Sequence, residues 1–548
     1  MPAITKIYEE NTFTVANQTW AGPGTVTVEE DAFVSVVGAD AFDLSDGPWK
    51  VTIDGTIQSN LNGIVFNGAA TKNSTLKIGT EGAIINSAGF HGAIETHHGL
   101  DVTNSGVVRG YYGIEEFGSA KTVTITNSAS GEIYGSAIGI VDGGTIGMLV
   151  IKNAGVISGN VGYGIVASSH LTLTNSGTIS DMSTSLAASI TNSGTIGVTE
   201  CGDGDDKVTN TGELANINFK NGENSLTNGG YIPGNVLFGI GDDTMTNTGT
   251  IEGNVTLSDG MNKVTNSGTL LASLSAGNGD DTFKITGSVI GEINPGGGND
   301  QVTGGNNVEF VRDGGGDDVY KLGGGNDVVI YTTFGNDSFD GGTGSDTFDS
   351  SSFNDFSLAY NLGTKAFSTG FGTYAASSLS TVSETPVGTI KGFETVLGTK
   401  SSDVFIGGGA AETFDGASGV DRIIGGGGAD RLTGGTGDDI FAYFDVKDSG
   451  KTVATRDTIT DFTGANAVGG DSIDFSAIDT NTKLAGDQGF SWIGNDKEFN
   501  HVAGVAELRS VTINGDTILQ GDVNGDGKVD FSIDVVGTQN FIATDFVL

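Results

Sequence analysis

The chain has a single cysteine, Cys201, and only six prolines among its 548 residues. One cysteine excludes an intrachain disulfide, and a lone cysteine is most often a small buried apolar residue, so redox chemistry is not expected. Basic residues are also scarce, because 25 Lys and Arg stand against 67 Asp and Glu, which gives a formal net charge of −42. Such a surface repels nucleic acid and anionic lipid, and it destabilises its own compact state unless cations neutralise it. The composition therefore argues against a nucleic-acid partner and indicates bound divalent metal ions.

Long apolar runs are missing as well. No stretch of about 18 apolar residues occurs anywhere, so no membrane insertion is expected. The N-terminal residues contain no apolar core of the length that a secretory signal peptide requires. If the protein is exported, we expect a route other than Sec.

Glycine is abundant, with 92 copies, and its recurrence at a fixed period is the signature of a solenoid. The first repeat is an Asn-(Ser/Thr)-Gly turn. Between successive turns, apolar and polar residues alternate, and Val, Ile and Thr are frequent. This pattern predicts β-strands, with Asn-Gly supplying a positive-φ turn. From Asn175 the turns follow at intervals of 17, 18, 18, 19 and 19 residues, at Asn192, Asn210, Asn228, Asn247 and Asn266. A fixed period predicts stacked rungs, and the arrangement resembles the parallel β-helix of autotransporter passengers and filamentous adhesins.

A second repeat, Gly-x-x-Asp-x-apolar, interleaves with the first from about residue 201. The Asp of this repeat is expected at a corner, where the chain turns from one strand of a rung into the next. Up to Asp300 this corner residue recurs every 18 or 19 residues, and Asn224 and Asn262 occupy positions where acids would be expected. Calcium sites or ordinary turns both remain open there. Beyond Asp300 the interval halves to 9 or 10 residues, so both corners of a rung carry acids, at Glu309, Asp318, Asp327, Asp337 and Asp346.

Five nine-residue units follow one another without a break between residues 398 and 442. Every sixth position is acidic, at Asp403, Glu412, Asp421, Asp430 and Asp439. Every eighth position is apolar, at Phe405, Phe414, Ile423, Leu432 and Phe441. The glycines allow a turn with inward carbonyl oxygens and the acid adds a charged oxygen, which is the ligand set that Ca²⁺ prefers. Consecutive units should fall on opposite sides of a roll, so that units two apart stack and share an ion.

This pattern resembles the repeats-in-toxin family, whose nonapeptides form a calcium-binding parallel β-helix. The resemblance implies several calcium ions as cofactors. The predicted metal ligands are Asp206, Asp243, Asp281, Asp300, Asp318, Asp327, Asp337, Asp346, Asp403, Asp421, Asp430 and Asp439.

Residues 443–548 resemble the C-terminal domain of serralysin-type secreted proteins, on the strength of the segments that begin at Asp457, Asp471 and Gly521 and of the last six residues. The resemblance implies an uncleaved C-terminal signal that is read by a type I secretion system. Residues 522–530 also match the first nine positions of an EF-hand loop, but the twelfth position is Ile533 instead of Glu. Calcium binding and a tight β-turn are the alternatives for this loop.

Catalytic motifs are few. His-Glu-x-x-His and Gly-x-Ser-x-Gly are absent, which argues against a serralysin protease and against a lipase. A cluster of His91, His97 and His98 precedes Tyr112 and Glu115, and we expect His91 to stack near Tyr112 and Tyr163, with Glu95 near Glu115. Such a face could place a general acid and base on a sugar polymer, bind a carbohydrate without catalysis, or be a solvated face that repetition produces.

The predicted fold is all-β: an elongated right-handed parallel β-helix that passes into a calcium-binding β-roll and ends in a β-rich capping domain. The predicted segments are an N-terminal cap (1–50), a β-helix with Asn-Gly turns (51–200), a hybrid β-helix and β-roll (201–349), an insertion or spacer (350–397), the nonapeptide β-roll (398–442) and the C-terminal domain with its secretion signal (443–548).

The leading hypothesis for function is a non-enzymatic exoprotein, secreted or held at the cell surface, of the adhesin, surface-layer or biofilm-matrix type. Its expected partners are calcium and the type I secretion machinery, with a cell-surface polysaccharide or self-association left open. The alternative is a polysaccharide-modifying lyase or epimerase on the same scaffold. In either case we expect calcium dependence to increase from residue 200 toward the C-terminus.

Overall fold

The computed structural model describes residues 4–9, 11–14, 18–68, 72–87, 89–117, 121–144, 147–362, 370–373, 385–464, 470–480 and 488–548. The chain forms two compact units: unit 1 is Met1–Asn278 with Gly287–Gly291, and unit 2 is Gly279–Thr286 with Glu292–Leu548. The described residues form β-strands and one short 3-10 helix, η1 (Ala543–Asp545), and contain no α-helix. Nearly all strand pairs are parallel, so the predicted all-β class and parallel strand arrangement are confirmed.

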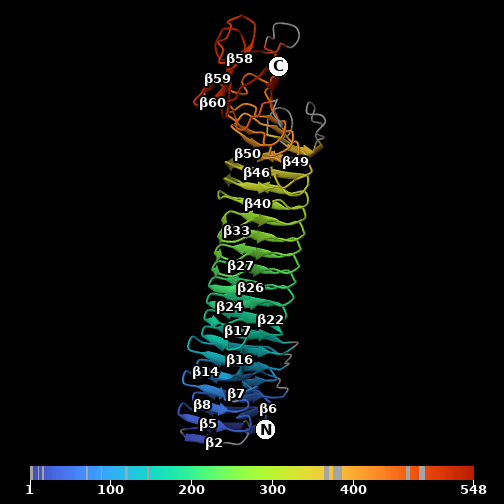
Figure 1. Cartoon of the computed structure of the whole chain (residues 1–548). Coiled ribbons are helices and arrows are strands. Elements are labelled where there is room, and N and C mark those ends of the chain that lie inside the picture. The colour runs from blue at the N-terminus through green and yellow to red at the C-terminus, as the bar shows by residue number, and fades with distance from the viewer. Residues whose placement is uncertain are drawn as a thin grey trace. The chain divides into compact units, whose positions relative to one another are not determined.

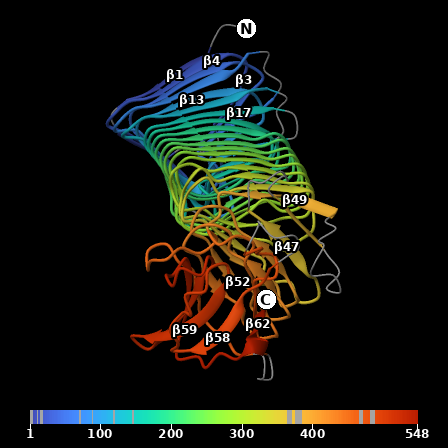
Figure 2. The same ribbon diagram turned by 90° about the horizontal axis from the view of Figure 1, so that it is seen from above.

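One face of unit 1 is a column of parallel strands, one from each rung. In the strand His170–Asn175, buried and exposed residues alternate, as expected of a strand with one face in a core. Its Leu173 pairs with Ile190 of the next rung. In-register parallel pairing continues along the column, whose strands lie side by side in Figure 2. The strands are β4 (Gly24–Val28), β7 (Trp49–Ile53), β10 (Ser74–Ile78), β13 (Leu100–Asn104), β15 (Val123–Asn127), β17 (Met148–Asn153), β20 (His170–Asn175), β23 (Ala188–Asn192), β25 (Lys207–Asn210), β27 (Ser225–Asn228), β30 (Thr244–Asn247) and β33 (Lys263–Asn266).

The strands on the remaining faces of unit 1 also pair in parallel with the strands of the next rung (Figure 1). Their strands include β9 (Ile64–Phe66), β12 (Gly92–Thr96), β14 (Val107–Glu116), β16 (Glu132–Asp142), β18 (Val156–Gly159), β19 (Ile165–Ala167), β21 (Thr178–Ile179), β22 (Met182–Thr184), β24 (Thr195–Glu200), β26 (Glu213–Asn218), β28 (Tyr231–Ile232), β31 (Thr250–Ile251), β34 (Thr269–Leu270) and β37 (Ser288–Val289). The single cysteine, Cys201, is fully buried, as predicted.

The asparagines of the first repeat form a buried ladder at the end of the β13 to β33 column. The side-chain amide of Asn175 donates a 2.8 Å hydrogen bond to Oδ1 of Asn192, and Asn192 donates an equally short bond to Asn210. The ladder runs from rung to rung through Asn104, Asn127, Asn153, Asn175, Asn192, Asn210, Asn228, Asn247 and Asn266. Stacking of the rungs therefore provides hydrogen-bond partners for these buried amides. Each amide left without a partner would destabilise the fold by about 1–3 kcal/mol.

The predicted positive-φ turn at these asparagines is wrong. Gly177 and Gly194 do not belong to the residues with positive φ. A Cβ at Gly194 would instead clash with the carbonyl oxygen of Gly177 in the neighbouring rung. Glycine is required here because adjacent rungs approach closely. Positive-φ glycines do occur at the acidic corners, as at Gly419 and Gly437.

Unit 2 repeats the nine-residue period in short strands on two faces. Val404 pairs with Arg422, and Thr413 pairs with Arg431, so units two apart stack while consecutive units lie in different sheets. One face contains β36 (Thr282–Ile285), β39 (Gln301–Thr303), β41 (Val319–Lys321), β44 (Asp337–Asp340), β51 (Val404–Ile406), β53 (Arg422–Ile424), β55 (Ile440–Ala442) and β57 (Ser472–Asp474). The other contains β40 (Phe310–Arg312), β43 (Val328–Ile330), β46 (Thr347–Asp349), β50 (Thr395–Leu397), β52 (Thr413–Asp415), β54 (Arg431–Thr433) and β56 (Thr458–Ile459). The apolar residues at the eighth positions of the nonapeptides lie in the core, where each is at most 1 % exposed.

Antiparallel pairing is confined to two regions of the described part of unit 2. Strand β48 (Gly370–Thr373) runs antiparallel to β47 (Leu358–Asn361) and to β49 (Thr385–Lys391). Near the C-terminus, β59 (Glu507–Ile513), β60 (Asp516–Asp522) and β61 (Phe531–Val535) form an antiparallel sheet. Strand β61 then pairs in parallel with β56 of the roll, and β62 (Phe546–Val547) pairs with β57. The C-terminal segment thus continues both faces of unit 2.

Candidate metal centre

Acidic side chains line one corner of unit 2, where each residue immediately precedes or begins a strand of the β36 to β44 face. The backbone N–H of Asp281 donates a 2.7 Å hydrogen bond to Oδ1 of Asp300. Asp300 donates in the same way to Asp318 at 2.7 Å, and Asp318 donates to Asp337 at 2.8 Å. One carboxylate oxygen of each acid is therefore fixed by the backbone of the preceding rung.

The same contact recurs among the nonapeptides. Asp403 donates its N–H to Oδ1 of Asp421 at 2.6 Å, Asp421 donates to Asp439 at 2.8 Å, and Asp439 donates to Asp471 at 3.0 Å. The series thus extends beyond the last nonapeptide into the C-terminal segment.

A second corner carries a parallel series. Glu309 donates its N–H to Asp327, Asp327 donates to Asp346, and Asp346 donates to Glu394, each at 2.8 Å. Glu412 bonds in this way to Asp430 at 2.8 Å, and Asp430 bonds to Asp457 at 3.0 Å. Both corners of the roll are therefore lined by acids in register.

The second carboxylate oxygen of most of these acids is buried and has no hydrogen-bond partner within the described chain. This holds for Oδ2 of Asp206, Asp243, Asp300, Asp327, Asp337, Asp346, Asp421, Asp430, Asp439 and Asp457 and for Oε2 of Glu412. Two predicted ligands differ: Oδ2 of Asp403 accepts the N–H of Thr399 at 2.6 Å, and Oδ2 of Asp318 accepts the hydroxyl of Tyr320 at 3.3 Å. A buried carboxylate oxygen without a donor is costly, so most of these corners require a positive charge.

Glycine keeps space open beside these oxygens. A Cβ at Gly425 would lie 2.5 Å from Oδ2 of Asp430, and a Cβ at Gly434 would lie 2.5 Å from Oδ2 of Asp439. Any side chain at the first position of the nonapeptide would therefore occupy the space that the free oxygen faces. Buried oxygens beside such a space fit a hard cation, for which six to eight oxygen ligands are typical.

Burial raises the pKa of these carboxyl groups. The pKa of Asp421 rises to about 9 through burial and through the nearby charges of Asp403 and Asp439, although the N–H of Asp403 opposes the rise. Burial also raises the pKa of Asp337 to about 7 and that of Asp439 to about 6. Without a cation, burial therefore favours the protonated form of these carboxyl groups, most strongly at Asp421.

In unit 1 the same corner alternates acids with amides. Asp206 donates its N–H to Oδ1 of Asn224, Asn224 donates to Asp243, and Asp243 donates to Asn262, at 2.8–3.1 Å. Each carboxylate thus has an amide as its neighbour in the adjoining rung. The corner of unit 1 consequently carries half the charge per rung of the corresponding corner of unit 2.

Five acids of these series are not among the predicted ligands. Glu309 and Glu412 were predicted at corners but not as ligands, whereas Glu394, Asp457 and Asp471 were predicted as neither. Asp471 lies 32 residues after Asp439, which is outside the nine-residue frame. Asp457 lies 27 residues after Asp430, which is a multiple of nine but exceeds the 18-residue interval of the preceding rungs. The available signal was the Asp-x-Ile segment at each, which repeats the acid-x-apolar order of the nonapeptides.

The three histidines flank β12: His91 precedes the strand, and His97 and His98 follow it. The N–H of Tyr111 donates to the carbonyl oxygen of His91 at 3.2 Å, while Tyr112 pairs with Gly92. The expected stacking of His91 near Tyr112 is therefore displaced by one residue, since the neighbour of His91 across the rungs is Tyr111.

Glu95 and Glu115 pair directly on adjacent strands, as expected. Nε2 of His97 lies 2.6 Å from Oε1 of Glu95. Burial, with the charge of Glu95, raises the pKa of Glu115 to about 7. His98 is separate from this pair, because it is buried and its Nε2 lies 2.9 Å from Oγ of Ser74.

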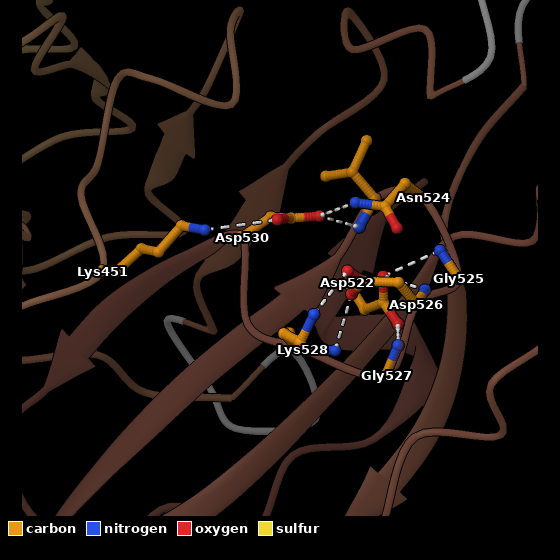
Figure 3. Close-up of polar contacts among 9 residues, drawn as sticks. Lys451, Asp522, Asn524, Gly525, Asp526, Gly527, Lys528 and Asp530 are labelled. Atoms are coloured by element: carbon orange, nitrogen blue, oxygen red, sulfur yellow. Dashed lines mark hydrogen bonds and ion pairs between the residues drawn. The ribbon is translucent and has the colours of Figure 1, made fainter.

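The loop that resembles an EF-hand connects β60 to β61 and is closed by its own carboxylates (Figure 3). Asp522 accepts backbone N–H groups from Gly525 at 2.8 Å and from Gly527 at 2.7 Å. Asp530 accepts the N–H of Val523 at 3.0 Å and faces Nζ of Lys451 at 3.3 Å. Every carboxylate oxygen of Asp522 and Asp530 has a donor, which favours the tight-turn interpretation of this loop.

Comparison with known proteins identifies the C-terminal part of the chain. Residues 337–548 match the family described as Peptidase M10 serralysin C terminal, which covers less than half of the chain. Among solved structures, the AlgE6R3 subunit of the Azotobacter vinelandii mannuronan C5-epimerase matches with 30 % sequence identity over 26 % of this chain and 68 % of that chain, at a TM-score of 0.19. A search of curated proteins gave no match. Within the described residues, no helix is long and apolar enough to cross a membrane.

Proposed function

We propose that the chain is a secreted exoprotein whose acidic corners bind calcium, and that calcium binding stabilises the fold of unit 2. The observation that carries the proposal is the series of buried carboxylates in register, each with one oxygen bonded to the neighbouring rung and most with a second, unpartnered oxygen. The donors are all oxygens, which suit calcium better than zinc or copper. The formal charge of −42 also requires counter-cations for a compact state.

Calcium concentration supports a role outside the cell. Extracellular calcium modules bind with dissociation constants of roughly 10⁻⁴–10⁻³ M, so corners of that affinity stay empty in the cytosol and fill outside. Empty corners would leave the carboxylates to repel one another, and the chain would remain loose enough to be exported. The match of residues 337–548 to a serralysin C-terminal domain supports export by a type I secretion system.

A structural or adhesive role fits the architecture best. Unit 1 is a stack of parallel rungs that a buried amide ladder joins, so it presents a long repetitive surface. Such a surface suits a surface layer, a biofilm matrix or an adhesin. Self-association into sheets or filaments on calcium addition, followed by light scattering and electron microscopy, tests this role. A chain that stays monomeric and fails to attach to cells at every calcium concentration would contradict it.

Calcium titration of the full-length chain tests the metal proposal. After chelation and buffer exchange, near-ultraviolet circular dichroism and isothermal titration calorimetry should show tertiary structure appearing together with the binding of several ions. Magnesium at the same concentration is the control, because its smaller, strictly octahedral coordination suits these corners poorly. Identical spectra with and without calcium, together with no heat of binding, would refute the proposal.

A polysaccharide-modifying enzyme is the second candidate. The paired Glu95 and Glu115, with a pKa of about 7 for Glu115, could serve as a general acid and base. Uronic-acid polymers incubated with the wild type and with Glu115→Gln should then yield unsaturated or epimerised products from the wild type alone. No turnover on a broad polymer panel would eliminate this candidate.

A further inference from the structure

Asp313 occupies a position that is uncharged in the neighbouring repeats. The residue five places before the corner acid is glycine in the nonapeptides, at Gly398, Gly416 and Gly434. In the corresponding repeats of unit 1 it is a buried apolar residue, such as Cys201 or Phe219. Before Asp318 it is Asp313, whose side chain is only 2 % exposed. A carboxylate thus replaces a glycine or an apolar residue beside one particular corner.

Three carboxylates meet at this corner. One oxygen each from Asp313, Asp318 and Asp337 lie within 4.8 Å of one another, and all three residues are buried. Oδ2 of Asp313 accepts the hydroxyl of Thr333 at 3.2 Å. Oδ1 of Asp313 and Oδ2 of Asp337 are buried and have no hydrogen-bond partner in the part of the chain that the structure describes. The site therefore offers two free buried oxygens in addition to the oxygen of Asp318 that accepts the Tyr320 hydroxyl.

Among the described residues, no ion pair joins a basic side chain to Asp313, Asp318 or Asp337. Arg312 is adjacent in sequence, but its guanidinium forms a bidentate pair with Glu292, at 2.8 and 2.9 Å. The backbone of Asp313 is held in the core, where its N–H donates to the carbonyl oxygen of Ile330 at 2.9 Å. The side chain consequently cannot turn toward solvent without breaking the rung, and three buried like charges require a cation.

We propose that Asp313, Asp318 and Asp337 form the high-affinity calcium site of unit 2, which fills first as calcium rises and empties last on chelation. This inference rests on the proposed calcium-binding function. Ligand charge is one of the two properties that set calcium affinity, and this corner places three carboxylates where the Asp281–Asp300 and Asp421–Asp439 corners place two. Ordering of unit 2 should accordingly begin around β41 and β44.

Terbium luminescence can observe this site directly, because Tb³⁺ replaces Ca²⁺ in oxygen sites and is excited through a nearby tyrosine. Tyr320 is fully buried, and its hydroxyl contacts Oδ2 of Asp318. In a titration of the calcium-free full-length chain, the earliest emission phase should come from this corner. Tyr331 is also buried near this corner, because burial and the charges of Asp337 and Asp313 raise the pKa of its hydroxyl. Tyr320→Phe and Tyr331→Phe together should therefore remove that phase, while calorimetry still shows calcium binding.

Asp313→Asn is the decisive variant, since it keeps the volume and the acceptor for Thr333 but removes the charge. It should shift the first phase of the terbium and calcium titrations to at least tenfold higher concentration and leave the later phases in place. Asp439→Asn, in a two-carboxylate corner, should alter only a later phase, and exposed Asp317→Asn should alter none.

The outcomes separate the two proposals. If the wild type binds neither ion, the calcium-binding function itself fails. If the wild type binds both ions and the Asp313→Asn titration superimposes on it, only the high-affinity site is refuted. Should Asp313→Asn fail to fold in saturating calcium, the double variant of Tyr320→Phe and Tyr331→Phe decides: retention of the earliest emission phase would place the first ion elsewhere, and its loss supports the site.

Discussion

The backbone N–H of Asp403 donates a 2.6 Å hydrogen bond to Oδ1 of Asp421, so the acid of one rung is held by the acid of the next. The two oxygens of Asp421 therefore have different tasks. Oδ1 fixes the rung spacing, whereas Oδ2 is buried and free. Because an asparagine retains an Oδ1 acceptor and lacks the charge, substitution at this position can separate the two tasks.

Asp421→Asn should weaken calcium binding in the nonapeptide roll about tenfold, equivalent to about 1.4 kcal/mol, while the calcium-saturated fold persists. The reason is that the variant keeps the acceptor for Asp403 and loses one negative ligand. Isothermal titration calorimetry measures the effect. Asp438→Asn is the matched control, because Asp438 is exposed beside the corner acid Asp439, and an equal loss of affinity in both variants would show that only net charge matters.

The pH dependence of the calcium-free protein should be inverted relative to that of the calcium-bound protein. The pKa values of Asp421, Asp337 and Asp439 are raised to about 9, 7 and 6, whereas an unfolded aspartate titrates near 4. The folded state then binds more protons, so its stabilisation is complete below about pH 4 and is lost as pH rises through 6 to 9. Calcium binding should instead weaken as pH falls, because protons compete for the same oxygens.

Urea unfolding in calcium-free buffer at pH 5 to 8, followed by circular dichroism, measures this dependence. The midpoint urea concentration should fall steadily with increasing pH. A midpoint that rises with pH without calcium would mean that the corner carboxylates are ionised and paired in the folded state, contrary to their burial.

Chelation should loosen unit 2 before unit 1. The β13 to β23 rungs are held by amide pairs such as Asn175 with Asn192, which need no ion, whereas unit 2 has acids at both corners. Hydrogen exchange with mass spectrometry, with and without chelator, should show protection retained at residues 100–192 and lost at residues 300–440. Uniform loss along the chain would show that the distribution of acids does not determine local stability.

Adjacent glycines provide a test of rung packing. A Cβ at Gly230 would clash with the carbonyl oxygen of Gly212, whereas the closest atom to a Cβ at Gly229 is Oγ1 of Thr248, at 3.4 Å. Gly230→Ala should therefore destabilise unit 1 by about 1–3 kcal/mol, as overpacking typically does, while Gly229→Ala should change stability by less than about 0.5 kcal/mol. Thermal unfolding in calcium compares the two variants, and equal melting temperatures would contradict the close-approach explanation.

Much of this architecture could be predicted from the sequence because the period itself encodes it. Alternating residues fixed the strands, and the nine-residue interval placed Phe405 and Ile423 in paired positions of the core. The role of Asn192 could not be derived in the same way. An Asn-Ser-Gly triplet is a common turn signal, and only the stacked backbone reveals that its amide points inward to a neighbour 18 residues away.

The candidate site was predictable only where the frame is unbroken. Glu394 follows Asp346 by 48 residues, and Asp457 follows Asp430 by 27 residues where the preceding rungs have an interval of 18, so neither spacing matches the rung interval. Asp313 was missed for another reason, since it stands where the repeat calls for glycine and therefore does not match the acid pattern. Proximity in the fold, not position in the repeat, brings it to Asp318 and Asp337.

The alternation of Asp206, Asn224, Asp243 and Asn262 in unit 1, contrasted with acids at both corners of unit 2, has a consequence for ionic behaviour. Rungs about 4.8 Å apart with an acid at each of two corners give unit 2 about one charge per 2.4 Å of height, close to the roughly 1.7 Å of duplex DNA. A polyanion of this linear charge density condenses monovalent counterions. Calcium uptake by unit 2 should therefore displace sodium or potassium. The logarithm of the calcium affinity should fall linearly with the logarithm of the salt concentration, as it does for nucleic-acid binding.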